Sequence, residues 1–175
     1  MYVGHLGIAL GARGAAPQVP VWVLVLATQG CDWLELLLGT VLDGRDAVVW
    51  SHSIPAVAAA ALALGVVVAM AFRSIGGGIA AAVAHASHWP LDFVGSLKPT
   101  WPGHPPAGLI LYERPMLDFA AQATVIVLGW LLYQRCLRPE RRFSSLSWLL
   151  VIALLLLQGL SDWVIHRGFL QGTSI

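Results

Sequence analysis

The sequence predicts an all-α protein: a single polytopic membrane helix bundle of five to six transmembrane helices over residues 1–175. The first observation is composition, because 58% of the 175 residues are hydrophobic and only 11% are charged, whereas a soluble domain carries about 25% charged residues. The second is a mean hydropathy of +0.76 with a net charge of +1. These values exclude a soluble globular protein, a disordered chain and a nucleic-acid binder with a basic surface.

Apolar stretches separated by short polar turns account for the expected helices. In chain order they comprise residues 2–16, 19–38, 54–72, 75–97, 119–136 and 147–164. The clearest is 54–72, which contains no charged residue and is about as long as a helix needs to be to cross a bilayer. Residues 2–16 are glycine-rich and too short to cross alone, so they predict a short helix that is either buried in the bundle or re-entrant.

The connecting segments predict the orientation of the bundle. Proline and glycine in 98–114 predict a loop, and the charges in 43–46 predict an exposed turn. Four arginines fall within 135–142, and such basic turns stay on the cytoplasmic side. The absence of asparagine, and a single lysine against nine arginines, indicate a GC-rich bacterial genome. We therefore expect a multi-pass protein of a bacterial inner membrane, with 98–114 on the non-cytoplasmic side.

Ionisable side chains gather in the outer layer of the predicted bundle. His88 and Asp92 are four residues apart, and Asp32 and Glu35 are three apart, so each pair shares one helix face. His52 immediately precedes the third stretch. Lipid cannot solvate such groups, so their side chains should face one another inside the bundle.

Imidazole together with carboxylate oxygen favours a divalent metal ion, with zinc preferred and manganese or iron possible. Four residues are the candidate ligands, and their donor atoms should lie within roughly 5 Å of a common point. These are Asp32, His52, His88 and Asp92, with His5 as a fifth candidate or a hydrogen-bonding neighbour. Glu35 and Asp118 are the candidate general bases, because burial raises a carboxyl pKa towards neutrality. The alternative for His88 and Asp92 is a hydrogen-bonded pair that only locks the bundle.

Four short motifs resemble a known family. GHLGIAL at 4–10, CDWLE at 31–35, SHS at 51–53 and SHWPLD at 87–92 are similar, in order and spacing, to the bacterial membrane-bound metal-dependent hydrolases, some of which are LexA-regulated. The motifs also fit a sister group of small uncharacterised membrane proteins with SHS and SHWxLD. The resemblance covers residues 4–102 and implies metal ligands at His5, Asp32, His52, His88 and Asp92.

The chain departs from the family pattern in two segments. In the acidic segment, Leu34 stands where the family has a second aspartate and Glu35 stands where it has histidine. Before the third span, AVVW replaces the family's His-Arg-Gly. The remaining residues supply ligands for one metal ion rather than two.

The sequence therefore favours a metal-dependent hydrolase that acts at the outer membrane interface on a lipid-linked or amphipathic ester or phosphoester. The HExxH and GxSxG motifs of zinc proteases and serine hydrolases are both missing. Three alternatives use the same polar layer: a proton- or cation-coupled transporter, a haem protein with paired histidines, and a structural membrane protein. The transporter is disfavoured because few polar residues continue towards the inner face.

Overall fold

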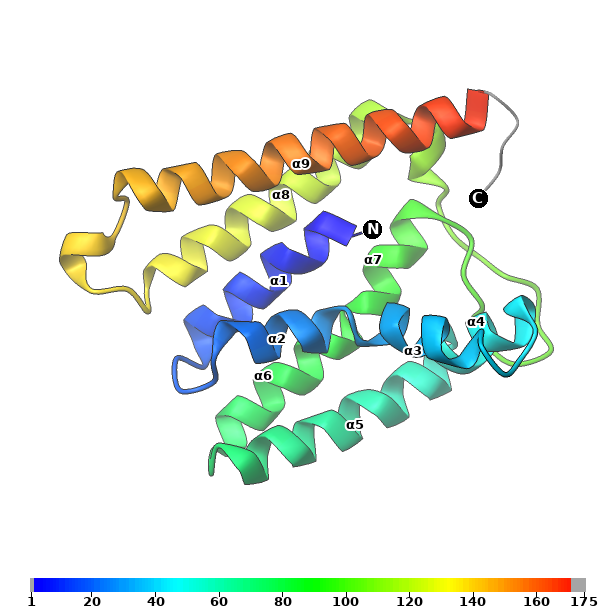
Figure 1. Cartoon of the computed structure of the whole chain (residues 1–175), viewed down its shortest axis with the longest axis horizontal. Coiled ribbons are helices and arrows are strands. Elements are labelled where there is room, and N and C mark those ends of the chain that lie inside the picture. Colours follow the sequence, from blue (N-terminus) through cyan, green and yellow to red (C-terminus); the bar gives the residue numbers. More distant parts are fainter. Residues whose placement is uncertain (1, 171–175) are drawn as a thin grey trace.

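The computed structural model describes residues 2–170 and is all-α (Figure 1). The α-helices are α1 Tyr2–Ala15, α2 Val21–Thr28, α3 Gly30–Leu38, α4 Gly44–His52, α5 Ile54–Ala71, α6 Ile75–Ala86, α7 His88–Gly95, α8 Pro115–Gln134 and α9 Ser145–Leu170. Two 3₁₀ turns, η1 Leu111–Glu113 and η2 Pro139–Arg141, join the later helices. The predicted all-α class is confirmed.

Three helices, α5, α8 and α9, are long and apolar enough to cross a membrane. Helices α2 and α3 provide a fourth candidate span if the pair is counted as one, although it bends by 53° between them. Only 17% of the apolar window of α5, and the same share of α9, is buried inside the protein. The outer faces of these helices are therefore suited to contact lipid.

Two of the predicted stretches are broken near their middles. Gln29 leaves the helical conformation between α2 and α3, and Ser87 separates α6 from α7 within the stretch 75–97. A helix end leaves backbone carbonyls without intrahelical partners. Here the carbonyls of Ala27 and Thr28 accept hydrogen bonds from the side chains of His85 and His88, each at 2.8 Å. The break after α2 thus leaves two carbonyls that orient the rings of His85 and His88.

Helix α1 lies in the middle of the bundle and packs on α2, α6, α8 and α9 (Figure 1). Its closest neighbour is α8, and glycine permits the approach. A Cβ on Gly7 would lie 2.7 Å from the Cα of Ile126, which is closer than real Cβ contacts allow. Small residues let membrane helices pack backbone to backbone, and this contact fixes the height of His5 in the bundle.

The exposed turn predicted over 43–46 is instead the start of helix α4. The Asp43 carboxylate accepts a hydrogen bond from the backbone N–H of Asp46 at 3.0 Å, which is an N-cap. The exposure of Arg45 and Asp46 is confirmed, but the helix is not apolar enough to be recognised from hydropathy. As a result, His52 is the last residue of α4, one step before α5 begins.

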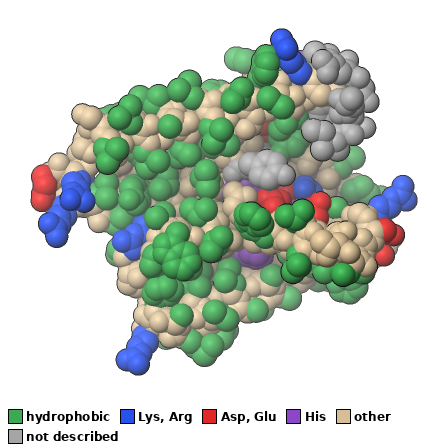
Figure 2. All heavy atoms as spheres, in the orientation of Figure 1, with side chains coloured by type: hydrophobic (Ala, Val, Ile, Leu, Met, Phe, Trp, Pro, Cys, Tyr) green, Lys and Arg blue, Asp and Glu red, His purple; other side chains and the backbone are tan. Residues whose placement is uncertain are grey.

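The helix connections separate towards the two ends of the long axis. The α1–α2, α5–α6 and α8–α9 turns lie at the left end of Figure 1, and the α3–α4 turn and the loop after α7 lie at the right end. Lys and Arg side chains appear at both ends, whereas the flank between them is largely hydrophobic (Figure 2). This arrangement suits a protein whose middle is embedded in a bilayer.

Candidate metal centre

Four of the predicted ligands converge where α3, α4 and α7 meet. Asp32 comes from α3, His52 from the end of α4, and His88 and Asp92 from α7. One donor atom of each lies within 4.8 Å of every other, so the predicted convergence is confirmed. His52, His88 and Asp92 are buried, and Asp32 is 26% exposed.

Five of the six distances between the donor atoms are close to those of a tetrahedral site. The Nε2 atoms of His52 and His88 are 3.1 Å apart, and Asp32 Oδ1 lies 3.4 and 3.5 Å from them. Asp92 Oδ2 lies 3.6 Å from His52 Nε2 and 3.3 Å from His88 Nε2. Ligand bonds of about 2.0–2.2 Å give a regular tetrahedron with edges of about 3.3–3.6 Å. The sixth distance, between the two carboxylates, is within 4.8 Å, so the group can hold a divalent metal ion.

The Nδ1 atoms of both histidine rings are also hydrogen-bonded. His88 Nδ1–H donates to the carbonyl of Thr28 at 2.8 Å. His52 Nδ1–H donates to Ser51 Oγ at 2.8 Å and lies 3.2 Å from Glu35 Oε2. A proton on Nδ1 leaves the Nε2 lone pair free for a metal, which is the usual arrangement around metal-binding histidines.

Lys98 also belongs to the site, although its sequence context did not predict this. Its Nζ lies 2.8 Å from Asp92 Oδ2, and its side chain is only 19% exposed. Burial by itself would lower the pKa of Lys98, but the Asp92 carboxylate reverses this and raises it. Lys98 is therefore a cation beside the carboxylate. In the sequence, its position just after α7 was the only indication that it belongs to the site, because residues in a loop do not follow a helical period.

His5 lies beside the four-residue group rather than within it. The His5 ring is fully buried and leans on the His88 ring, with centroids 4.2 Å apart. Its Nε2 is 3.9 Å from Asp92 Oδ1, the oxygen that faces away from the other donors. This position suits the hydrogen-bonding neighbour considered for His5 better than a direct ligand, and its ligand role stays a prediction.

The two candidate bases lie in different surroundings. Glu35 touches His52, as described above, and is 38% exposed. Asp118 is buried in α8, where its Oδ2 accepts a hydrogen bond from Gln122 Nε2 at 3.3 Å. The side chain of Asp118 also contacts Asp162 of α9. Asp118 thus belongs to a second polar cluster between α8 and α9, and its catalytic role stays a prediction.

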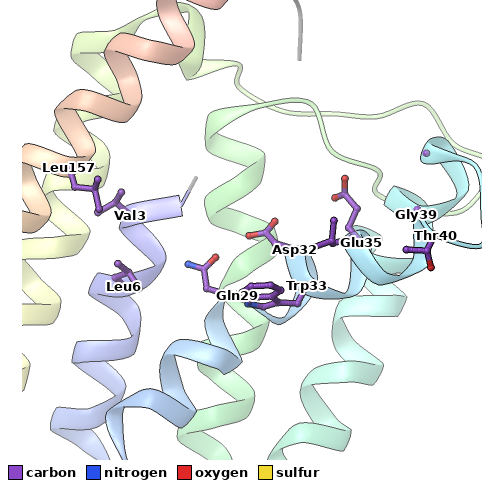
Figure 3. Close-up of a pocket in the computed structure, with 12 residues that line it drawn as sticks. Val3, Leu6, Gln29, Asp32, Trp33, Glu35, Gly39, Thr40 and Leu157 are labelled. Atoms are coloured by element: carbon purple, nitrogen blue, oxygen red, sulfur yellow. The ribbon is translucent and has the colours of Figure 1, made fainter.

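A cavity of about 830 Å³ opens beside the metal centre. Asp32 and Glu35 lie on its α3 side, and Val3, Leu6 and Leu157 lie across it on α1 and α9 (Figure 3). The surface view shows acidic and histidine side chains gathered among hydrophobic ones on this face (Figure 2). The cavity therefore has carboxylates on its α3 side and apolar side chains across from them.

These features define a class: a helical protein with candidate membrane spans and a buried His/Asp group that could bind a metal. No protein-family model, curated protein or solved structure matches the chain.

Proposed function

We propose that this protein is a membrane-embedded, zinc-dependent hydrolase of a lipid-linked or amphipathic ester or phosphoester. The observation that carries the proposal is the tetrahedral spacing of Asp32, His52, His88 and Asp92, with both histidine Nδ1 atoms already hydrogen-bonded. The resemblance of its four motifs to the membrane-bound metal-dependent hydrolases agrees with this ligand set. The five to six spans expected from the sequence belong to the same proposal.

The roles of the residues follow from their contacts. Bound zinc polarises a carbonyl or phosphoryl oxygen and lowers the pKa of water. Asp32 is the ligand that lines the cavity, so substrate reaches the centre from its side. Glu35 lines the same cavity, and we assign it as the general base. Asp118 fits this role less well because its contacts are with Gln122 and Asp162.

The cavity supports an amphipathic substrate. Its apolar walls include Val3, Leu6, Trp33, Leu36 and Leu157, and these suit an acyl or isoprenoid chain. The side of the cavity that carries Asp32 and Glu35 suits the bond to be hydrolysed. Because basic turns usually stay cytoplasmic and these lie at the opposite end of the bundle, we expect the cavity to open to the non-cytoplasmic side.

Metal analysis with two histidine variants tests the proposal. Wild-type protein purified in detergent should contain about one zinc per chain and hydrolyse a lipid-like ester or phosphodiester. His88→Ala should lose both, because it removes one corner of the donor set. His85→Ala is the matched control, since His85 is also buried but bonds Ala27 and Cys31 instead. Zinc-free wild type, or equal zinc in both variants, would support the structural lock.

The haem alternative fits the geometry poorly. A haem held between two histidines needs the whole porphyrin ring to pass between their Nε2 atoms. The Nε2 atoms of His52 and His88 are only 3.1 Å apart, and the carboxylates of Asp32 and Asp92 stand beside them. A single small ion fits this space, and a macrocycle does not.

A further inference from the structure

Asp92 has two partners that compete for the same oxygen. Its Oδ2 is the atom that completes the tetrahedral donor set, 3.3 Å from His88 Nε2. The same Oδ2 lies 2.8 Å from the Lys98 ammonium. The ion pairs of Asp32 are with His52 and His88, whereas Asp92 also pairs with Lys98.

The position of Lys98 is built into the fold. Its backbone N–H donates to the carbonyl of Ala107 and its carbonyl accepts from the N–H of Ala107, both at 2.9 Å. The N–H of Leu109 then donates to the carbonyl of Phe93 in α7 at 2.8 Å. These bonds tie the returning loop to the helix that carries Asp92. The lysine therefore reaches the carboxylate from a fixed backbone.

An ammonium on a carboxylate oxygen weakens that oxygen as a metal ligand. It withdraws electron density through a charge-assisted hydrogen bond, and it also repels a nearby divalent cation. Asp92 should then be the weakest of the four ligands. This bears on catalysis, because structural zinc sites have four full protein ligands whereas catalytic sites have three and one exchangeable position.

We propose that Lys98 is a positioning residue that holds Asp92 back from full ligation and so keeps the centre open for substrate. The inference rests on the proposed function, because it assumes that the four-residue group binds zinc. It assigns Asp32, His52 and His88 as the permanent ligands. Lys98 thereby decides whether the same four residues make a structural or a catalytic site.

Replacing Lys98 by methionine tests this assignment through metal affinity. Lys98→Met removes the ammonium but keeps a side chain of similar bulk, so Asp92 is released to the ion. Zinc affinity, measured by competition with a chromophoric chelator, should rise about tenfold, the scale on which outer partners tune metal sites. Hydrolysis should fall, because Asp92 then occupies the position that water or substrate needs. Lys98→Arg should retain the wild-type affinity and activity.

A double-mutant comparison separates this effect from general damage. In the Asp92→Asn background, Lys98→Met should leave zinc affinity unchanged, because the carboxylate through which the lysine acts is gone. Lys98→Gln repeats the test if the methionine variant is not monodisperse in detergent. Unchanged or weaker zinc binding in both Lys98→Met and Lys98→Gln, with wild type binding zinc normally, would overturn this inference alone. Failure of the wild type to bind zinc would overturn the proposed function as well.

Discussion

At the level of single residues, each histidine of the centre is held through one ring nitrogen and offers the other. His88 is held by a backbone carbonyl of α2, and His52 by Ser51 and Glu35. The aromatic contact of His5 with His88 adds a second constraint on the His88 ring. The Nε2 atoms are thus oriented before any ion binds, which lowers the entropic cost of binding.

The sequence predicted these ligands because their chemistry is costly in a membrane. A buried carboxylate or imidazole needs a partner, so Asp32, His52 and the α7 pair of His88 and Asp92 had to converge from three helices. It could not predict Lys98, because a loop of proline and glycine carries no period that places a side chain. Nor could it separate Glu35 from Asp118, since the division between two polar clusters depends on how α1 packs between the helices.

Glu35→Gln should abolish most hydrolysis while zinc content is retained. The amide oxygen can still accept from His52 Nδ1–H, so the ring stays oriented, but the amide cannot take up a proton. Loss of a general base lowers kcat by about 10²–10⁴-fold. Turnover and zinc content should be measured on the same preparation, with exposed Glu113→Gln as the control. Full activity in Glu35→Gln would remove Glu35 from the mechanism.

At the level of helices, the breaks in α2–α3 and α6–α7 do more for the site than the long spans do. Hydropathy predicted continuous stretches at 19–38 and 75–97, because it averages over residues and does not register a single turn that leaves the helix. The break at Gln29 supplies the carbonyls that hold His85 and His88. Glycine at position 30 is also required, since a Cβ there would lie 2.8 Å from the His85 ring.

Gly7→Ala should destabilise the bundle through the α1–α8 contact. The added methyl would lie 2.7 Å from the Cα of Ile126, and neighbouring backbone cannot move as a side chain can. Overpacking of this kind costs about 1–3 kcal/mol, seen as a lower Tm in detergent. Gly44→Ala is the control, because nothing lies within 4 Å of the new methyl. Equal Tm values for the two variants would contradict the packing assigned to α1.

Asp162→Asn should stabilise the contact between α8 and α9. Gln122 and Gln158 each donate to the carboxyl of their own helix. Asp118 Oδ1 and Asp162 Oδ2 have no hydrogen-bond partner among the described residues. An amide at 162 relieves repulsion with Asp118 and adds a donor, a gain of about 1 kcal/mol. The Tm should rise by a few degrees, whereas exposed Asp46→Asn should not change it; a fall in Asp162→Asn would contradict this account.

At the level of the whole molecule, the buried ionisable side chains of the described residues gather towards one end. Beyond the metal centre, the second cluster of Asp118 and Asp162 also lies towards the end of the bundle that carries α3 and α4, while the arginines of 135–142 lie at the opposite end. The buried polar pair at that opposite end, Gln134 and Ser147, is uncharged. A relay across the membrane would need ionisable side chains at both ends of the bundle. This asymmetry is what favours an interfacial enzyme over a transporter.

Cysteine labelling should place the metal centre and the arginine turn on opposite sides of the membrane. His104 in the loop after α7 and Glu140 in η2 are both exposed, so either position accepts a cysteine without disturbing the bundle. In a Cys136→Ser background, buried Cys31 is shielded from reagent. A membrane-impermeant maleimide should label His104→Cys in intact cells, and Glu140→Cys only after permeabilisation, because basic turns remain cytoplasmic. Labelling of both positions from one side would refute the orientation, and with it a substrate cavity that opens to the non-cytoplasmic face.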